Sequence, residues 1–167
     1  MADTTQGFHS LSAADVDGDG KHEIVYGSAT IDHDGSLLYS SFATLPEGSA
    51  APGTEARLGH GDAMHVTDID PDRPGLEIFT VHEGATEAPY GMAMRKAKTG
   101  DVILGVYSGR DTGRGMVGDV VPESRGLSRG RVCPVARRVC SACTPRPGGR
   151  SPMRFPAPIR ASAGRPT

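Results

Sequence analysis

The sequence ADVDGDGKHEIVYG, residues 14–27, decides what kind of fold to expect. It crowds four carboxylates into nine residues, and they belong to Asp15, Asp17, Asp19 and Glu23. Carboxylates this close repel one another unless a cation lies among them. In a turning loop alternate carboxylates point inward, Gly20 permits the turn, and the backbone carbonyl of Lys21 adds an oxygen. Such a loop suits Ca²⁺, which takes roughly six to eight oxygen ligands.

The spacing excludes the EF-hand, a common calcium motif. An EF-hand loop has its Glu at the last position, whereas Glu23 comes earlier and leads directly into the β-type residues Ile24, Val25 and Tyr26. We therefore expect a calcium loop between strands of an all-β protein. The alternative is an Asp- and Gly-rich turn that lies in solvent and binds nothing.

The acidic loop recurs along the chain. Residues 68–77 read DIDPDRPGLE and lead into IFTV, as the first loop leads into IVY. The acidic residues of this second loop are Asp68, Asp70, Asp72 and Glu77. A third, eroded copy covers residues 118–123, and the three copies are spaced by 53 and 51 positions, counted from Asp15, Asp68 and Asp119. A period of about 50 residues with short strands is typical of β-propeller blades.

Each repeat has the same succession of expected strands. They precede the acidic loops at residues 10–14, 64–67 and 115–118, and they follow the turns DHDG and KTGD at residues 36–39 and 102–106. Turns of this composition between β-rich runs are usual hairpin connections. Residues 45–56, rich in Gly, Pro, Ala and Ser, are expected to form a loop insertion. Residues 1–123 are therefore expected to form a partial β-propeller of two to three blades with Asp-rich calcium loops.

Charge divides the chain near residue 123. All 20 acidic residues lie in residues 1–123 beside 8 basic ones, a net charge of −12, whereas residues 124–167 hold 10 Arg and no acidic residue. This second segment also contains all 3 Cys and 7 of the 13 Pro and has no periodicity, so we expect a disordered tail. Its composition is typical of a GC-rich gene that is translated in the wrong reading frame. A frameshift near residues 121–130 is our hypothesis, and it fails if neither other reading frame continues the repeat.

Composition argues against several other classes of protein. No apolar run approaches the length of a membrane span, and the start, MADTTQGFHSLS, lacks the basic and apolar regions of a signal peptide. Cys140 and Cys143 have the C-x-x-C spacing, but only Cys133 accompanies them, which is one ligand short of a zinc site. The Arg-rich tail lacks the motifs of nucleic-acid-binding folds. We expect no membrane and no nucleic-acid partner.

Aligning the repeats brings polar residues from different blades to one rim. His9, Asp62 and the Gly113–Arg114 pair lie at or next to the position six residues before each loop, and His60 shares a strand face with Asp62. Glu83 is a weaker addition. Such a cluster suits a metal and an anionic substrate, and the alternative is a set of unrelated polar loop residues. His22, His33 and His65 are expected to be structural or exposed, and Phe8, Tyr26 and Phe79 to lie in the core.

Four segments carry a resemblance to a known family. GFHSLSAADVDGDGKHEIVYG, IDHDGSLLYS, GHGDAMHVTDIDPDRPGLEIF and GRGM resemble the rhamnogalacturonan lyases of polysaccharide lyase family eleven, over about residues 6–126. The resemblance implies secreted enzymes with an eight-bladed β-propeller and bound Ca²⁺ that cleave the rhamnose–galacturonate backbone of pectin by β-elimination. It places His9, His60, Asp62 and Arg114 on active-site positions. It implies a catalytic metal near His60 and Asp62, with His9 and Glu83 as further candidates, and Arg114 as a substrate contact or base.

The departures from the family pattern matter equally. Val121 stands where the family has Asp, and Ser128 where it has Glu, so we expect the third metal site to be broken. The chain is expected to be an internal fragment that is inactive alone. The competing interpretation is a non-enzymatic, calcium-stabilised propeller of the integrin-like type that binds carbohydrate or protein. The motifs GHGD and GRGM favour the lyase, because a scaffold needs only the acidic loops.

Overall fold

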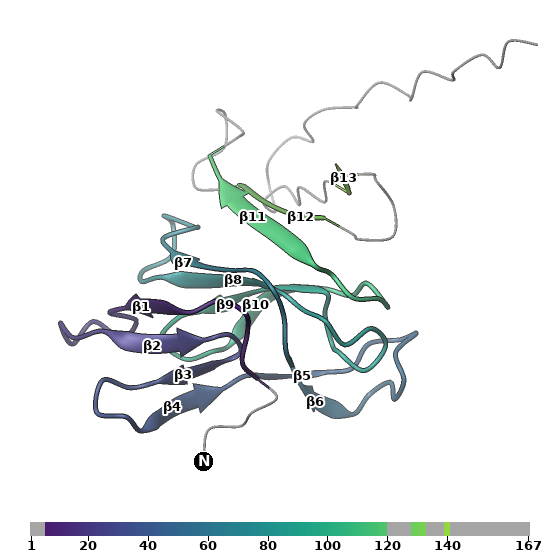
Figure 1. The fold of residues 1–167 in the computed structure, drawn as a ribbon, viewed down its shortest axis with the longest axis horizontal. Coiled ribbons are helices and arrows are strands. Elements are labelled where there is room, and N and C mark those ends of the chain that lie inside the picture. Colours follow the sequence, from purple (N-terminus) through teal and green to yellow (C-terminus); the bar gives the residue numbers. More distant parts are fainter. Residues whose placement is uncertain (1–5, 120–127, 133–138, 141–167) are drawn as a thin grey trace, which may run out of the picture.

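The computed structural model describes residues 6–119 together with the strand segments 128–132 and 139–140, the side chains being described for 6–119 only. The described residues contain strands and no helix, which confirms the all-β prediction. Consistent with this, no helix in the described part of the chain has the length and apolarity to span a membrane. The strands form two four-stranded sheets, one three-stranded sheet and a two-stranded hairpin, shown in Figure 1.

The first sheet is an antiparallel meander in the order β1-β2-β3-β4. Its strands are β1 (Ser12–Ala14), β2 (Glu23–Tyr26), β3 (Ala29–Ile31) and β4 (Leu37–Ser40). The first acidic loop joins β1 to β2, whose register pairs Ala14 with Glu23. The loop therefore closes one end of this sheet, directly between its first two strands.

The second sheet repeats the first in chain order, β10-β9-β8-β7. Its strands are β7 (Met64–Thr67), β8 (Glu77–Val81), β9 (Met92–Lys96) and β10 (Val102–Val106). The second acidic loop joins β7 to β8, and Thr67 pairs with Glu77 at the same place in the register as Ala14 with Glu23. Every residue of β8 is buried, as expected of a strand covered on both faces.

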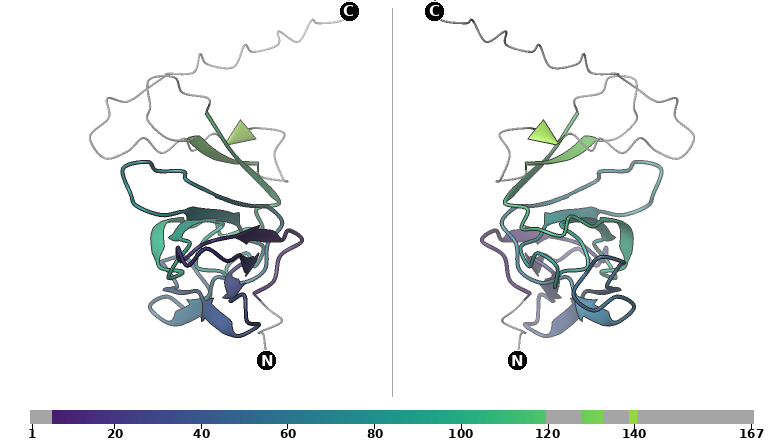
Figure 2. Two further views of the ribbon diagram at one scale, coloured as in Figure 1. Left: turned by 90° about the vertical axis from the view of Figure 1, so that its left-hand side faces the viewer. Right: turned by 90° about the vertical axis from the view of Figure 1, so that its right-hand side faces the viewer.

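Apolar side chains cover both faces of the second sheet. On one face Ile78 packs with Val25 of the first sheet and Val16 of the first acidic loop, and on the other Phe79 and Val81 pack in a cluster that includes Val117. Val117 belongs to β11 (Arg114–Gly118). In Figures 1 and 2 the second sheet accordingly lies between the first sheet and β11. Because successive side chains of β8 point to opposite faces of the sheet, β8 packs against the first sheet on one side and against β11 on the other, which joins three successive repeats.

A buried polar seam also joins the sheets. The Arg95 guanidinium is fully buried and donates to Ser41 Oγ at 2.8 Å and to the Gly27 carbonyl at 2.6 Å. Burial lowers the pKa of Arg95 to about 10, so the side chain remains charged at neutral pH. Gln6, equally buried, donates to the Ser41 carbonyl and accepts from the Gly59 amide at 2.7 Å. These bonds fix the segment before His60 against the first sheet.

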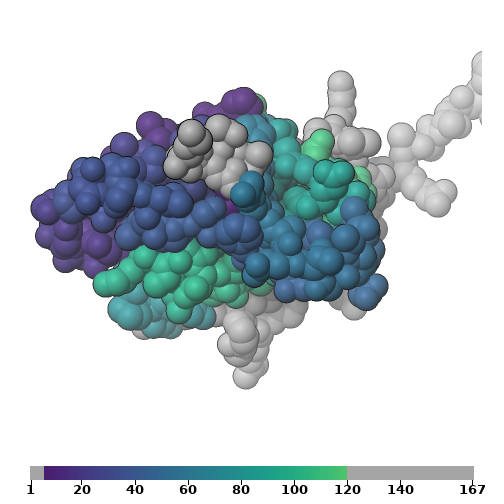
Figure 3. All heavy atoms as spheres, turned by 90° about the horizontal axis from the view of Figure 1, so that it is seen from below, coloured from purple at the N-terminus to yellow at the C-terminus, as the bar shows by residue number. Residues whose placement is uncertain are grey.

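The loop insertion differs from the sequence prediction. The loop expected at residues 45–56 is tied at its base by a hairpin of β5 (Phe42–Thr44) and β6 (Glu55–Arg57), because the insertion satisfies its backbone groups by pairing its own ends. Figure 3 shows atoms of the first sheet, in purple and blue, at one end of the molecule, with the blue-green atoms of this region toward the other.

The tail also contains strands that the sequence did not predict. β12 (Ser128–Val132) pairs antiparallel with β11, and β13 (Val139–Cys140) pairs with β12. Arg and Gly in this segment give no apolar alternation to detect, whereas ladder pairing uses backbone groups that every non-proline residue carries. The rest of the predicted tail, with Cys133 and Cys143, lies outside the described residues, as does Val121 before it.

Candidate active site and acidic loops

Five side chains from separate segments meet at one rim of the described structure. His9 Nε2 lies 3.3 Å from His60 Nε2 and 3.8 Å from Asp62 Oδ1. Arg114 Nη1 lies 2.9 Å from Asp62 Oδ2, and His60 Nε2 lies 3.8 Å from Glu83 Oε2. The structure therefore brings together His9, Asp62 and Arg114 from the repeat alignment, His60 beside Asp62, and the weaker candidate Glu83.

Backbone hydrogen bonds hold these segments in place. Phe8 and Gly61 form a parallel bridge, and the His9 amide donates to the Gly61 carbonyl at 3.2 Å. Ser10 Oγ donates to the Asp62 carbonyl at 2.8 Å, and the Glu83 amide donates to the His60 carbonyl at 2.9 Å. The site thus rests on ladder-type contacts between repeats rather than on loose loops.

Gly61, in the motif GHGD, is required by close packing. A Cβ at this position would lie 1.9 Å from the Val81 carbonyl oxygen and 2.7 Å from the Phe8 ring. Backbone oxygen has no room to yield at such a distance. The glycine therefore permits the approach that sets His60 beside His9.

The His60 ring is oriented by the backbone. Its Nδ1 hydrogen-bonds the Gly7 carbonyl, so Nδ1 must donate the proton. In neutral His60, Nε2 then carries a lone pair directed toward His9 and Glu83. An imidazole held at one nitrogen by a carbonyl, with the other nitrogen available, is the usual arrangement of a metal-binding or proton-accepting histidine.

Exposure divides the cluster into an anchored and an accessible part. The side chains of His9 and Arg114 are each 69% exposed, whereas that of Asp62 is only 16% exposed. Asp62 thus pairs with His9 and Arg114 from a more buried position, and these two are the most exposed members of the cluster, ahead of His60 at 42% and Glu83 at 35%. His60, Asp62 and Glu83 do not form a compact ligand set: the sets of three ligand atoms within 4.8 Å that the described residues contain both lie at the first acidic loop.

His82 was missed by the sequence analysis. It is fully buried, lies 5.3 Å edge-on from the Phe8 ring, and shares a 2.9 Å hydrogen bond with Thr80 Oγ1. Burial, and then the charge of Arg95, lower the pKa of His82 to about 3, so the ring is neutral and acts as packing. Its position directly after Val81, at the end of the fully buried strand β8, was the signal available for burial.

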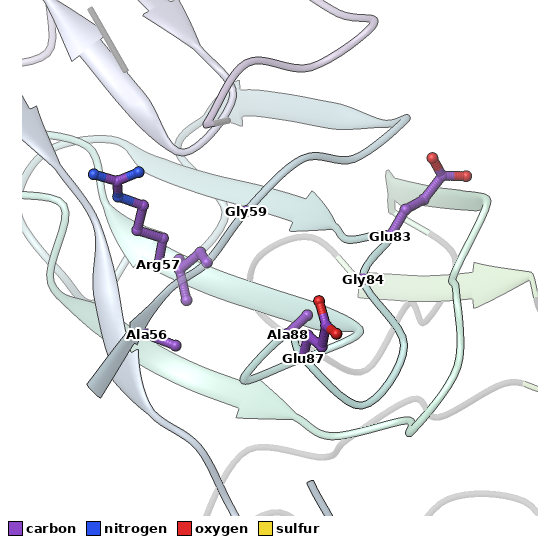
Figure 4. A pocket seen from close by; sticks show the side chains of 8 residues that line it. Ala56, Arg57, Gly59, Glu83, Gly84, Glu87 and Ala88 are labelled. Carbon is purple, nitrogen blue, oxygen red and sulfur yellow. The ribbon is translucent and has the colours of Figure 1, made fainter. Parts of the chain in front are cut away.

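A pocket of about 280 Å³ adjoins the cluster through Glu83. It lies between the β5–β6 hairpin and the chain after β8, and its lining residues are Ala56, Arg57, Leu58, Gly59, Glu83, Gly84, Glu87 and Ala88. Figure 4 shows Arg57 and Glu83 on opposite sides of this pocket. The pocket gives the rim a concave, charged extension.

The first acidic loop has carboxylates that face one another. One oxygen each of Asp15, Asp17 and Asp19 lies within 4.8 Å of the others. Glu23 is completely buried; its Oε2 accepts from the Val16 amide at 2.8 Å, and its Oε1 has no hydrogen-bond partner. An unpaired oxygen on a buried carboxylate that lies near Asp19 is unfavourable without a cation. The residues of this loop therefore fit Ca²⁺.

The second acidic loop uses its carboxylates differently. Glu77 Oε2 accepts from the amides of Ile69 and Asp70 at 2.9 and 3.0 Å, and Asp70 Oδ2 lies 3.1 Å from Arg73 Nε. Asp68 and Asp72 are exposed. Carboxylates of both loops accept backbone amides, as Asp15 does from Gly18 and Gly20. Among the described residues, however, the second loop has no set of three ligand atoms within 4.8 Å and no buried carboxylate oxygen without a partner, so it fits Ca²⁺ less closely. In the third loop only Asp119 among the acidic residues is described.

Comparison with known proteins assigns the family. The sequence model of the rhamnogalacturonan lyase family 11 C-terminal domain matches residues 2–135. The chain belongs to rhamnogalacturonan lyase family 11. It is 53% identical over 121 residues to the rhamnogalacturonan exolyase YesX of Bacillus subtilis (strain 168), and 50% identical over 121 residues to the rhamnogalacturonan endolyase YesW of the same organism. These matches cover 72% of this chain and 17% of each relative.

Solved structures give the same result. The crystal structure of exotype rhamnogalacturonan lyase YesX matches with a TM-score of 0.68 and 49% identity, over 81% of this chain and 20% of that one. The Bacillus licheniformis rhamnogalacturonan lyase PL11 matches with a TM-score of 0.65 and 50% identity, over 77% of this chain and 19% of that one. The chain is thus a member of a pectin-degrading lyase family and spans about a fifth of these relatives.

Proposed function

We propose that these residues form part of the active site of a rhamnogalacturonan lyase, which cleaves the rhamnose–galacturonate backbone of pectin by β-elimination. The observation that carries the proposal is the meeting of His9, His60, Asp62, Glu83 and Arg114 at one rim. A scaffold protein has no need of two facing imidazoles beside an Arg–carboxylate pair. The relatives that match this chain are named as lyases of the same polysaccharide.

The reaction requires an acidified proton and a base. In β-elimination the C5 proton of galacturonate passes to a base, the C4–O bond breaks, and the departing oxygen takes up a proton. Arg114, exposed and held by Asp62, is positioned to pair with the uronate carboxylate, and this pairing makes the C5 proton more acidic. His9 and Arg114 are accessible enough to reach the sugar ring, and His60 is anchored to support them.

Calcium belongs to the same proposal. When bound, Ca²⁺ supplies positive charge that stabilises the uronate anion during proton removal. At the rim, the carboxylates of Asp62 and Glu83 would supply oxygen ligands beside the imidazoles of His60 and His9, and these groups would have to draw closer than they stand in this structure. At the corners of the sheets, the first acidic loop and less closely the second would hold structural ions.

The remaining features follow from the same assignment. The two four-stranded meanders are neighbouring blades of a propeller, and the chain contributes two to three of them. The complete enzyme acts outside the cell on pectin, and this segment alone is inactive, since it spans only 17% of its curated relatives.

The test uses the longer protein that contains this segment. Incubation with rhamnogalacturonan and Ca²⁺ should yield unsaturated uronate, detected by its ultraviolet absorbance. His60→Ala and Arg114→Ala should each lower kcat/KM by at least about a hundredfold. His65→Ala, which removes an imidazole from β7, should not lower kcat/KM by that much. Absence of unsaturated product, with intact calcium binding, would instead support a non-enzymatic binding module.

A further inference from the structure

The pocket beside the rim is continuous with it along two segments of the chain. One wall carries Arg57, three residues before His60, and the other carries Glu87, four residues after Glu83. The Glu83 amide donates to the His60 carbonyl at 2.9 Å, so the two walls meet at the rim itself. Three residues of fully extended chain span at most roughly 11 Å, which limits the distance between the Cα atoms of Arg57 and His60. A polysaccharide that lies across the rim can therefore reach the pocket.

The β5–β6 hairpin, which forms one wall, has no counterpart in the second repeat as far as the structure describes it. Residues 41–63 join the first sheet to the second, whereas a much shorter segment joins β10 to β11. The loop of the hairpin is fixed at two points. The Ala50 amide donates to the Thr86 carbonyl at 2.8 Å, and Tyr107 Oη donates to the Gly48 carbonyl at 2.7 Å. Compact, packed loops of this kind frequently carry function.

The opposite wall contains a strained turn. Ala85 has a φ of +46°, and in the described part of the chain it is the one residue other than glycine with a positive φ. Asp111 Oδ1 holds the turn by accepting from the amides of Gly84 and Ala85 at 2.8 and 3.0 Å. Such strain costs about 1–3 kcal/mol and persists where the surrounding structure fixes the shape of a binding surface. Both walls of the pocket are thus held in place.

The lining of the pocket suits a neutral sugar better than an acidic one. Its charged groups are the guanidinium of Arg57 and the carboxylates of Glu83 and Glu87, so negative charge is in excess and opposes a uronate. Sugar hydroxyls can donate to the carboxylates and accept from the guanidinium. Ala56 and Ala88 add an apolar part to the lining. The volume of about 280 Å³ is close to the lower limit of roughly 300 Å³ for ligand pockets, which leaves room for a single small ring.

We propose that this pocket binds the rhamnose unit next to the galacturonate at the rim, with Arg57 and Glu87 as specificity-determining residues. In a backbone that alternates rhamnose and galacturonate, both neighbours of a galacturonate are rhamnose, so the assignment holds for either direction of the chain. Rhamnose is uncharged, and it carries a methyl group where galacturonate carries its carboxylate. The methyl group suits the apolar part of the lining. The inference rests on the proposed function, because that function places galacturonate at Arg114.

The kinetic test uses the longer protein that contains this segment. Arg57→Ala and Glu87→Ala should each raise KM for rhamnogalacturonan at least about fivefold while kcat changes less than about twofold, because contacts away from the broken bond act equally in the ground state and the transition state. Both side chains are exposed, so the variants should fold. Arg110→Ala and Glu47→Ala are matched controls, since they remove the same charges from exposed positions outside the lining. An unchanged KM in both pocket variants, or an equal rise in the controls, would overturn the proposal.

A binding test identifies the sugar and needs no turnover. Saturation-transfer NMR measures the binding of free rhamnose and of free galacturonate, each at millimolar concentration, to the same variants. Glu87→Ala should weaken the binding of rhamnose several-fold and leave that of galacturonate unchanged, and Arg114→Ala should do the reverse. Weaker binding of galacturonate instead of rhamnose in Glu87→Ala, or no change for either sugar, would overturn the proposal. If the parent protein forms no unsaturated product yet binds rhamnose through Glu87, the lyase assignment fails and the rhamnose pocket is supported.

Discussion

The two acidic loops occupy equivalent corners of the two sheets but use the same residue types differently. In the first, Glu23 keeps an unpaired buried oxygen close to other carboxylates. In the second, one Glu77 oxygen accepts two backbone amides, and Asp70 pairs with Arg73. Matching sequence patterns therefore do not guarantee matching sites. The difference lies at the buried Glu: Glu23 Oε1 has no donor, whereas no oxygen of Glu77 is left buried without a partner.

The largest expected effect is that of removing Glu77. Because Glu77 is only 2% exposed and its Oε2 serves two amides, Glu77→Ala would leave two buried donors without an acceptor. At about 1–3 kcal/mol for each unsatisfied donor, we expect a loss of roughly 3 kcal/mol or more in the free energy of unfolding. Urea unfolding in EDTA measures it. Glu77→Gln, which retains an oxygen acceptor, should lose less than half as much; equal losses would contradict this account.

Calcium should produce the next effect, mainly through the first loop. An ion at about a hundred times its Kd stabilises the folded state by roughly 2.7 kcal/mol. We expect EDTA to lower Tm, and the double change Asp17→Asn with Asp19→Asn to remove most of that response. The matched change Asp70→Asn with Asp72→Asn in the second loop should preserve most of it. Thermal unfolding with and without Ca²⁺ decides, and equal losses would remove the contrast between the loops.

The smallest effect should come from Arg73. It pairs with Asp70 at 3.1 Å, but its side chain is 48% exposed, and exposed pairs contribute about 0–1 kcal/mol. Arg73→Ala should therefore change stability little in EDTA, while removing a positive charge next to the second loop. Calcium titration of this variant should show tighter binding than the parent. Unchanged or weaker binding would mean that Arg73 does not compete with the ion.

Much of the candidate site could be predicted from the sequence, because the repeat shows which residues occupy equivalent positions in successive units. His9, Asp62 and Arg114 occupy related positions in successive repeats, so similar folding of each repeat brings them to one rim. The predicted strands at residues 64–67 and 102–106 coincide with β7 and β10. Periodicity and turn chemistry depend on residues close together in the chain, so they can be recognised in the sequence itself.

Arg95 and Gln6 were not predicted, because nothing local distinguishes them from exposed polar residues. Arg95 and Gln6 are satisfied by partners far along the chain, such as Gly27 and Gly59. The strands β12 and β13 were missed for a related reason, since their pairing depends on the edge that β11 offers rather than on their own side chains.

The sequence alone determined the all-β class, the repeat, the family and the membership of the rim cluster, because each is encoded by residue type and spacing. The tertiary structure decided how the carboxylates of each loop are shared between backbone and solvent, and that the β5–β6 hairpin forms a pocket wall beside the rim. Those outcomes depend on distances between segments that meet only after packing. Hydrogen bonding and ion coordination respond to such distances within a few tenths of an ångström.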